Sequence, residues 1–316
     1  MRLARVAALS VGVVSLIGSS PPPLVIASSQ LPPPTTWTPA AASLLVYVDW
    51  QTLLSSPPLR GLEKALTERE PWEELEELRE LTGMDPWRDA WAVSFFKVSA
   101  ENRSSSWGLA IYGAFDPERV LDALRTRRRL TSAVHRETAI HLLDSTDDDS
   151  EGLAFPDSTT VLFGPVHQVR AMLDSGFGFA PSAADGELGP ALEKLSMAET
   201  LWAVGKDASE LPLVFARGTS RDTGVALRSF VVSARFGSDV DFEARGETSN
   251  REEARRLADL VKGLRAFTAL QPSAEPGFLE VLETLEVETL DESVEITAEI
   301  EGKFLRDLLE RSVKQK

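Results

Sequence analysis

Histidine is the usual general base of serine hydrolases and a common zinc ligand, and the chain contains three of them. His135 and His141 fall in two short segments, SAVHR and AIHLL, which are expected to be adjacent strands. Pairing of these strands would let the two imidazoles approach each other, but we favour the interpretation that both are ordinary strand residues. His167 falls in a segment of helical pattern, and no nucleophile elbow stands near it. No HExxH helix and no other third-ligand pattern is present. We therefore assign no catalytic residue to the chain.

The densest carboxylate cluster is DSTDDDSEG, and three of its acids take alternate positions as at the start of a calcium loop. These acids are Asp147, Asp149 and Glu151. Ser158 stands where such a loop needs a bidentate glutamate, so the pattern fails at its last ligand. We expect a solvated acidic loop and no structural metal, with a calcium site as the alternative.

Four of the seven tryptophans fall within a short stretch, at Trp72, Trp87, Trp91 and Trp107. Clustered aromatic side chains line grooves for sugars and apolar ligands, and they also fill the core beneath a sheet. Both interpretations stay open, and the four tryptophans are our candidates for a ligand-binding surface.

The composition excludes several function classes. No GxGxxG or GxxxxGK[ST] motif is present, so we expect no nucleotide and no other cofactor. Cysteine is absent, which rules out disulfides, thiolate catalysis and lipid attachment to a cysteine. Acids outnumber bases by 49 to 33, for a formal net charge of −16, so nucleic acid is not an expected partner.

The first residues have the pattern of an export signal. Arg2 and Arg5 precede an uncharged, mostly apolar run from Val6 to Gly18, which is shorter than the roughly 20 residues of a membrane helix. We expect a signal peptide over residues 1–29 and a periplasmic or extracellular protein. An uncleaved N-terminal anchor is the alternative, and membrane contact is expected only in that case. Residues 30–42 are rich in proline and are predicted to be an extended linker.

The rest of the chain repeats one succession of elements, two strands and then a helix. The four copies begin at WAVSFFKV, GLAFP, LRSFVVSARF and LEVETL. The helix of the third copy, residues 250–269, carries an apolar stripe that includes Leu257, with Arg256 on its polar side. The fold class predicted is α+β, with antiparallel sheet built from strand-strand-helix units and helices packed on one face.

A weaker symmetry lies above this succession. SLLVYVDWQTL and LWAVGKDASEL both run from a short apolar strand to an aspartate, and each precedes two of the copies. We infer a tandem duplication, with a first α+β repeat or domain over residues 43–182 and a second over residues 183–316. The chain has a generic pattern that resembles uncharacterised exported bacterial proteins. The resemblance rests on the leader and on the segments SLLVYVDW, GAFDPERVLDALR and TTVLFGPVHQVRAMLD. That resemblance implies no activity, and no functional residue carries over.

We expect a non-enzymatic protein of the cell envelope that acts by binding or structural association with a protein or a small ligand. A hydrolase that uses an unidentified carboxylate pair and a carrier of apolar ligands are the alternatives. A pocket of converging carboxylates would favour the hydrolase, and a closed apolar cavity the carrier. A filled core with flat faces would favour association.

Overall fold

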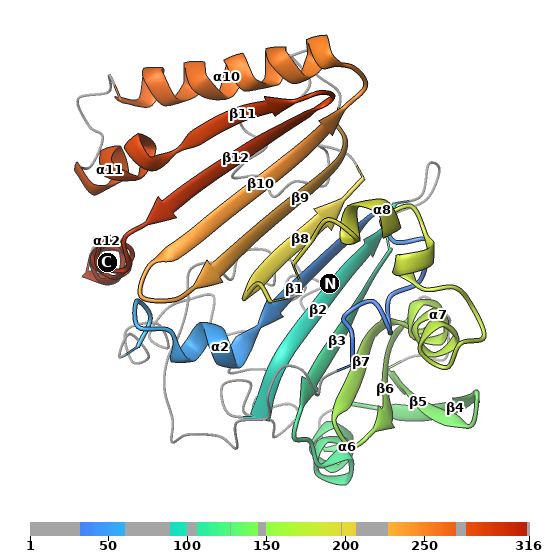
Figure 1. Ribbon diagram of the computed structural model, residues 1–316. Coiled ribbons are helices and arrows are strands. Elements are labelled where there is room, and N and C mark those ends of the chain that lie inside the picture. Colours follow the sequence, from blue (N-terminus) through green and yellow to red (C-terminus); the bar gives the residue numbers. More distant parts are fainter. Residues whose placement is uncertain are drawn as a thin grey trace.

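The computed structural model describes residues 32–60, 89–99, 106–126, 128–144, 150–196, 198–206, 227–269 and 276–314. Twelve strands form one sheet in the order β11-β12-β10-β9-β8-β1-β2-β3-β7-β6-β5-β4, shown in Figure 1. All of its strand pairs are antiparallel, which confirms the α+β class with an antiparallel sheet.

The strands are β1 (Leu44–Asp49), β2 (Ala90–Val98), β3 (Ser106–Gly113), β4 (Leu130–His135), β5 (Thr138–Leu143), β6 (Glu151–Asp157), β7 (Thr160–Pro165), β8 (Leu201–Gly205), β9 (Leu227–Phe236), β10 (Val240–Thr248), β11 (Glu286–Leu290) and β12 (Ser293–Ile300). The described α-helices are α2 (Trp50–Ser55), α6 (Pro117–Arg125), α7 (Val166–Gly176), α8 (Gly189–Leu192), α10 (Arg251–Ala269), α11 (Pro276–Thr284) and α12 (Gly302–Lys314). A short 3-10 helix covers Ala183–Asp185. Residues 71–82, in which apolar residues recur every three positions and predict a helix, lie outside the described residues.

The two halves of the chain meet at the centre of the sheet, where β1 pairs with β8. Outward from β1 the order is β2, β3, β7, β6, and outward from β8 it is β9, β10, β12, β11. The β4–β5 hairpin extends the first half alone. The strand order is thus matched between the two halves, and the tandem duplication stays a prediction.

Helices lie on both faces of the sheet, so the prediction that they pack on one face is wrong. Neighbouring residues of a strand point to opposite faces. In β7, Leu162 packs in the cluster that contains α7, whereas Val161 packs in the cluster that contains α6. An uninterrupted apolar run such as this one must be covered on both sides. We call the two faces the α7 face, with Leu45, Tyr47 and Leu162, and the α6 face, with Leu44, Val46 and Val161.

A large hydrophobic cluster lies on the α7 face, over the strands of the first half and β8. Trp202, Tyr112 and Phe96 are among its largest fully buried side chains, and α7 contributes Met172 and Leu173. The proline-rich segment joins this core, because Trp37 is only 5% exposed. Its backbone is also held: the Ala183 N–H donates to the Thr38 carbonyl at 2.8 Å. The described part of residues 30–42 is therefore packed structure, and the linker prediction is wrong there.

The second half is covered differently. Helix α10 packs on the α6 face, where Ala254, Leu257 and Ala258 contact Val294. Helix α12 follows β12 as α7 follows β7, but its Leu305 packs against the cluster around α2. The α7 face of β10, β12 and β11 thus keeps exposed side chains, among them Asp241, Glu243, Glu286, Glu288 and Glu299.

Candidate functional site

Seven carboxylates share the α7 face of three neighbouring strands in the second half. The cross-strand register places Glu243 opposite Thr297, and Thr297 opposite Glu286. Side chains directly opposite each other in an antiparallel pair lie on the same face. We define the acidic sheet face by the residues that this register brings together: Asp241, Glu243, Glu247, Glu286, Glu288, Glu295 and Glu299.

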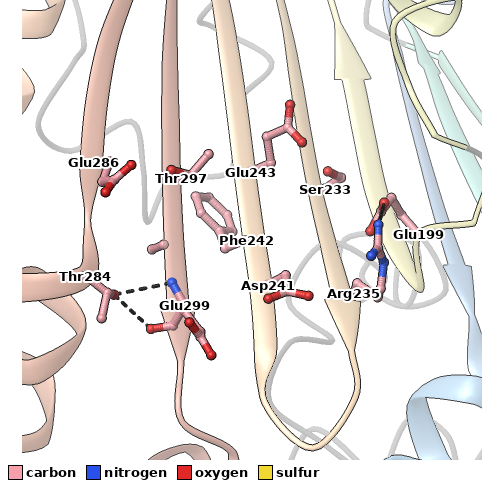
Figure 2. Close-up of a pocket in the computed structure, with 11 residues that line it drawn as sticks. Glu199, Ser233, Arg235, Asp241, Phe242, Glu243, Thr284, Glu286, Thr297 and Glu299 are labelled. Carbon is pink, nitrogen blue, oxygen red and sulfur yellow. Dashed lines mark hydrogen bonds and ion pairs between the residues drawn. The ribbon is translucent and has the colours of Figure 1, made fainter.

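An open hollow of about 440 Å³ lies over this face and is shown in Figure 2. Its walls include Glu199, Arg235, Asp241, Glu243, Glu286 and Glu299. Figure 2 shows these carboxyl groups on different strands and pointing in different directions, rather than toward one point. The hollow therefore offers a broad negative surface more than a focused acid–base site.

Two interactions set the charges within the hollow. Burial and the neighbouring carboxylate of Glu295 raise the pKa of Glu243 above its ordinary value of 4.5. At the border, the guanidinium of Arg235 donates to Glu199 at 2.7 Å, and Glu199 is 9% exposed. Because Arg235 already has an acidic partner, it does little to neutralise the rest of the face.

Each of the three histidines has a hydrogen-bond partner. His167 Nε2 lies 3.0 Å from Ser106 Oγ, and His141 Nδ1 lies 3.1 Å from Ser132 Oγ. His135 Nε2 lies 2.9 Å from the carboxylate of Asp174. A catalytic triad needs a serine and a carboxylate on the same histidine, whereas these serine contacts and this aspartate contact are made by different histidines. Strands β4 and β5 pair as expected, but Ser132 stands opposite His141 and Thr138 opposite His135.

Of the acids considered for calcium, Asp147 and Asp149 lie outside the described residues. Glu151 opens β6, is half-buried, and burial raises its pKa. Within the described ranges, no group of three or more histidine, aspartate or glutamate side chains is arranged to hold a metal ion. The absence of a structural metal stays a prediction.

Trp91 and Trp107 are described and Trp72 and Trp87 are not. Trp107 packs against Phe163, with ring centroids 5.5 Å apart, beside a buried cluster on the α6 face. Trp91 is half-buried in β2. The packing of Trp107 agrees with a core role for that residue, and a groove lined by all four tryptophans stays a prediction.

Sequence reasoning missed the acidic sheet face. The signal was present in VEITAEI, where acidic and apolar residues alternate as in a strand with one solvated side. The sequence does not show the strand register, which places Glu299 opposite Asp241 and Glu295 diagonal to Glu243.

Comparisons with known proteins add little. No family model matches the chain, and no curated protein matches it. Among solved structures, crystal form I of TP0453 has a TM-score of 0.48 and 10% identity, covering 90% of this chain and 99% of that chain. Crystal form IV of TP0453 gives 0.46 and 10%, covering 89% and 98%. These likenesses carry no argument about function.

One further result concerns membranes. Among the helices of the described segments, none combines the length and the apolar character needed to cross a bilayer.

Proposed function

We propose that this protein is exported, is not an enzyme, and associates with a cationic partner through the acidic sheet face. The observation that carries the proposal is the difference between the two halves. The α7 face is buried under α7 in the first half and exposes carboxylates in the second. An open sheet face with one dominant charge is a surface that a complementary partner can cover.

The chemistry of the face selects a basic partner, such as a lysine- or arginine-rich protein segment. Among the described residues of β9, β10, β12 and β11, the basic side chains that share the face with its seven carboxylates are Arg235 and Arg245, and Arg235 is paired with Glu199. Lys194 at the margin is paired with Glu247. Unbalanced negative charge of this kind attracts cations, speeds their encounter and rejects anionic partners.

The apolar-ligand carrier is less well supported. The hollow on the acidic sheet face is open and lined by charged side chains, whereas a carrier needs a mostly apolar cavity. The nearby core is filled by side chains such as Trp202 and Tyr112, both 0% exposed.

The hydrolase is the second candidate, because Glu243 and Glu295 interact and the pKa of Glu243 is raised. A carboxyl group whose pKa is raised by burial and by a neighbouring carboxylate is a candidate general acid. Release of reducing ends from a panel of envelope polysaccharides tests it. Under our proposal the chain releases none. Release that is lost in both Glu243→Gln and Glu295→Gln would favour the hydrolase instead.

Export rests on the leader, with Arg2 and Arg5 ahead of the run from Val6 to Gly18. N-terminal sequencing of protein from the extracytoplasmic fraction should begin near Ala27 or shortly after it. An intact Met1 in protein from the cytosol would contradict export.

Association is tested by calorimetric titration of the full chain with an oligolysine peptide and, as the matched ligand control, an oligoglutamate peptide. Oligolysine should bind, oligoglutamate should not, and the affinity for oligolysine should fall as salt is raised, because exposed charges are screened. Equal behaviour of the two peptides would contradict the proposal.

A further inference from the structure

The outer side of strand β4 carries backbone groups without a partner. The β4–β5 hairpin turns at Arg136 and Glu137, whose φ values of 49° and 62° are typical of a two-residue type I′ turn. In such a hairpin, residues bonded to the neighbouring strand alternate with residues whose groups point away from it. The Asp144 N–H donates to the Arg129 carbonyl at 2.8 Å, which agrees with this alternation. The residues whose N–H and C=O groups point outward are Leu130, Ser132 and Val134. Within the part of the chain that the structure describes, none of these backbone groups has a hydrogen-bond partner.

Strand β4 has none of the features that commonly protect the edge of a sheet. Proteins protect such edges with charged side chains, proline, bulges or a covering element. The six residues of the strand read LTSAVH, and their register with β5 runs without a shift from Leu130 to His135. Val134 is 76% exposed, and Ser132 is exposed as well. An edge of this kind is open to pairing with a further β-strand.

The opposite edge of the sheet is protected. Strand β11 carries Glu286 and Glu288, and helix α10 packs against it beside Val287. The guanidinium of Arg265 in α10 also donates to the Leu285 carbonyl at 2.7 Å, immediately before β11. Figure 1 shows β4 and β11 at opposite ends of the sheet. The difference between the two edges singles out β4 as the place where a strand can be added.

We infer that the added strand is β4 of a second copy of this chain, paired antiparallel about a two-fold axis that passes through Ser132. If the axis is perpendicular to the sheet, each face of one copy continues into the same face of the other. Residues that lie opposite each other must share a face, so an even-numbered residue must face an even-numbered one. The outward-pointing residues are all even-numbered, and centring them on Ser132 uses all three. Ser132 then lies opposite itself, and Leu130 lies opposite Val134 of the second copy.

The side chains of β4 suit a second copy of the same strand. On the α6 face, the exposed Val134 gains an apolar neighbour in Leu130 of the second copy, and on the α7 face Thr131 lies opposite Ala133. An isologous interface requires this kind of self-complementarity. Each copy has a net charge of −16, and β4 carries no acid. The two copies thus approach at an edge where no carboxylates of the paired strands oppose each other.

The charged side chains at the ends of the pairing are compensated within each chain. They are Arg128, Arg129, His135 and Arg136. Arg128 pairs with Asp144 of its own chain. His135 and Arg136 both contact Asp174, at 2.9 Å and 2.7 Å. Attraction between opposite charges therefore does not hold the two copies together, and raised salt should leave the dimer intact.

The dimer leaves the acidic sheet face free. Because β4 and β11 are opposite edges, the two acidic sheet faces would lie at the far ends of the joined sheet. A two-fold axis perpendicular to the sheet places both on the same side. Dimerisation is measured without any cationic partner, so either proposal can fail without the other.

Sedimentation equilibrium of the full chain tests the dimer, with Val134→Lys as the disrupting variant. Because one strand pair buries less area than a standard interface, association is expected in the micromolar range. The matched control is Ala139→Lys, which adds the same charge. Ala139 is exposed and lies opposite Val134 on the same face, but one strand further from the edge.

The parent and Ala139→Lys should dimerise with similar dissociation constants. Val134→Lys should raise the dissociation constant by about tenfold or more, because its charge would face Leu130 of the second copy at the paired edge. A parent that stays a single chain up to about 1 mM would overturn the proposal. Equal effects of the two lysines, or dissociation of the dimer by salt, would also overturn it.

The absence of cysteine permits a second test, of the register. The two-fold axis places the Cα atoms of the two copies of residue 132 about 5.5 Å apart, within the range of a disulfide. The two copies of residue 134 are offset by four residues along the strands, about 14 Å. Oxidation should therefore link Ser132→Cys into a covalent dimer and leave Val134→Cys unlinked. Linkage of Val134→Cys that equals or exceeds that of Ser132→Cys would overturn the proposed pairing.

Discussion

The ring of Trp37 packs directly against Gly176, so closely that a Cβ on this glycine would overlap the six-membered ring. Trp37 belongs to the proline-rich segment that precedes β1, and Gly176 is the last residue of α7. The contact ties the beginning of the described chain to the helix that covers the core.

Gly176→Ala should therefore destabilise the protein, because Trp37 is almost fully buried and must move to admit the methyl group. Overpacking of this kind costs about 1–3 kcal/mol of unfolding free energy. The control is Gly263→Ala in α10, where a Cβ meets open space, and it should stabilise by about 0.5–1 kcal/mol. Urea unfolding measures both. A neutral Gly176→Ala would contradict the packed N-terminal segment.

Leu257→Ala should cost about 2–5 kcal/mol of unfolding free energy, from lost transfer energy and the cavity left behind. Leu257 is 8% exposed and packs with Ala254, Ala258 and Val294. Arg256→Ala is the matched control one residue away. Its side chain is exposed and paired with Glu252, so the cost should stay within about 0.5 kcal/mol. Similar denaturation midpoints for the two variants would contradict the packing of α10.

The pH dependence of stability should report the interaction of Glu243 with Glu295. The folded-state pKa of Glu243 is raised above its ordinary value of 4.5, so the folded state holds this proton more tightly than the unfolded state. Its contribution is then present at low pH and is lost as pH rises through the raised pKa. Glu243→Gln should be at least as stable as the parent near neutral pH and lose that advantage in acid. A disadvantage that grows with pH would contradict the account.

Chelation should leave the thermal unfolding midpoint unchanged. A metal bound only to the folded state raises stability by mass action, so its removal lowers the midpoint. A drop of several degrees with chelator, restored by calcium, would show that Asp147, Asp149 and Glu151 form a site after all.

Local patterns predicted the elements better than their arrangement. In GAFDPERVLDALR, the pair Asp116 and Pro117 is typical of a helix start, and the Asp116 carboxylate indeed accepts from the Arg119 N–H at 3.2 Å at the start of α6. Patterns of this kind act within one turn of helix and can be read directly. The side of the sheet on which a helix lies cannot, because the apolar run around Val161 and Leu162 is compatible with cover on either face.

The candidate site was less predictable for a similar reason. Along one strand, Asp241 and Glu243 are ordinary residues of a solvated edge or face. Their alignment with Glu295 and Glu286 comes from pairing across three strands, which depends on the whole sheet. Trp37 was misjudged because proline-rich composition indicates an extended backbone and says nothing about what that backbone packs against.

The central claim is that the acidic sheet face binds a cationic partner, and it is tested most directly by titrating oligolysine into two variants of equal charge. One variant replaces four exposed acids of the face with their amides, at Glu243, Glu286, Glu288 and Glu299. The control replaces four exposed acids of α6 and α10, at Glu118, Asp122, Glu252 and Asp259.

The sheet-face variant should bind about 4- to 1,000-fold more weakly than the parent, since each of the four lost charge pairs contributes about 0.2–1 kcal/mol. The control variant should bind nearly as well as the parent. Equal loss in the two variants would show that net charge alone attracts the peptide and would contradict a specific acidic sheet face.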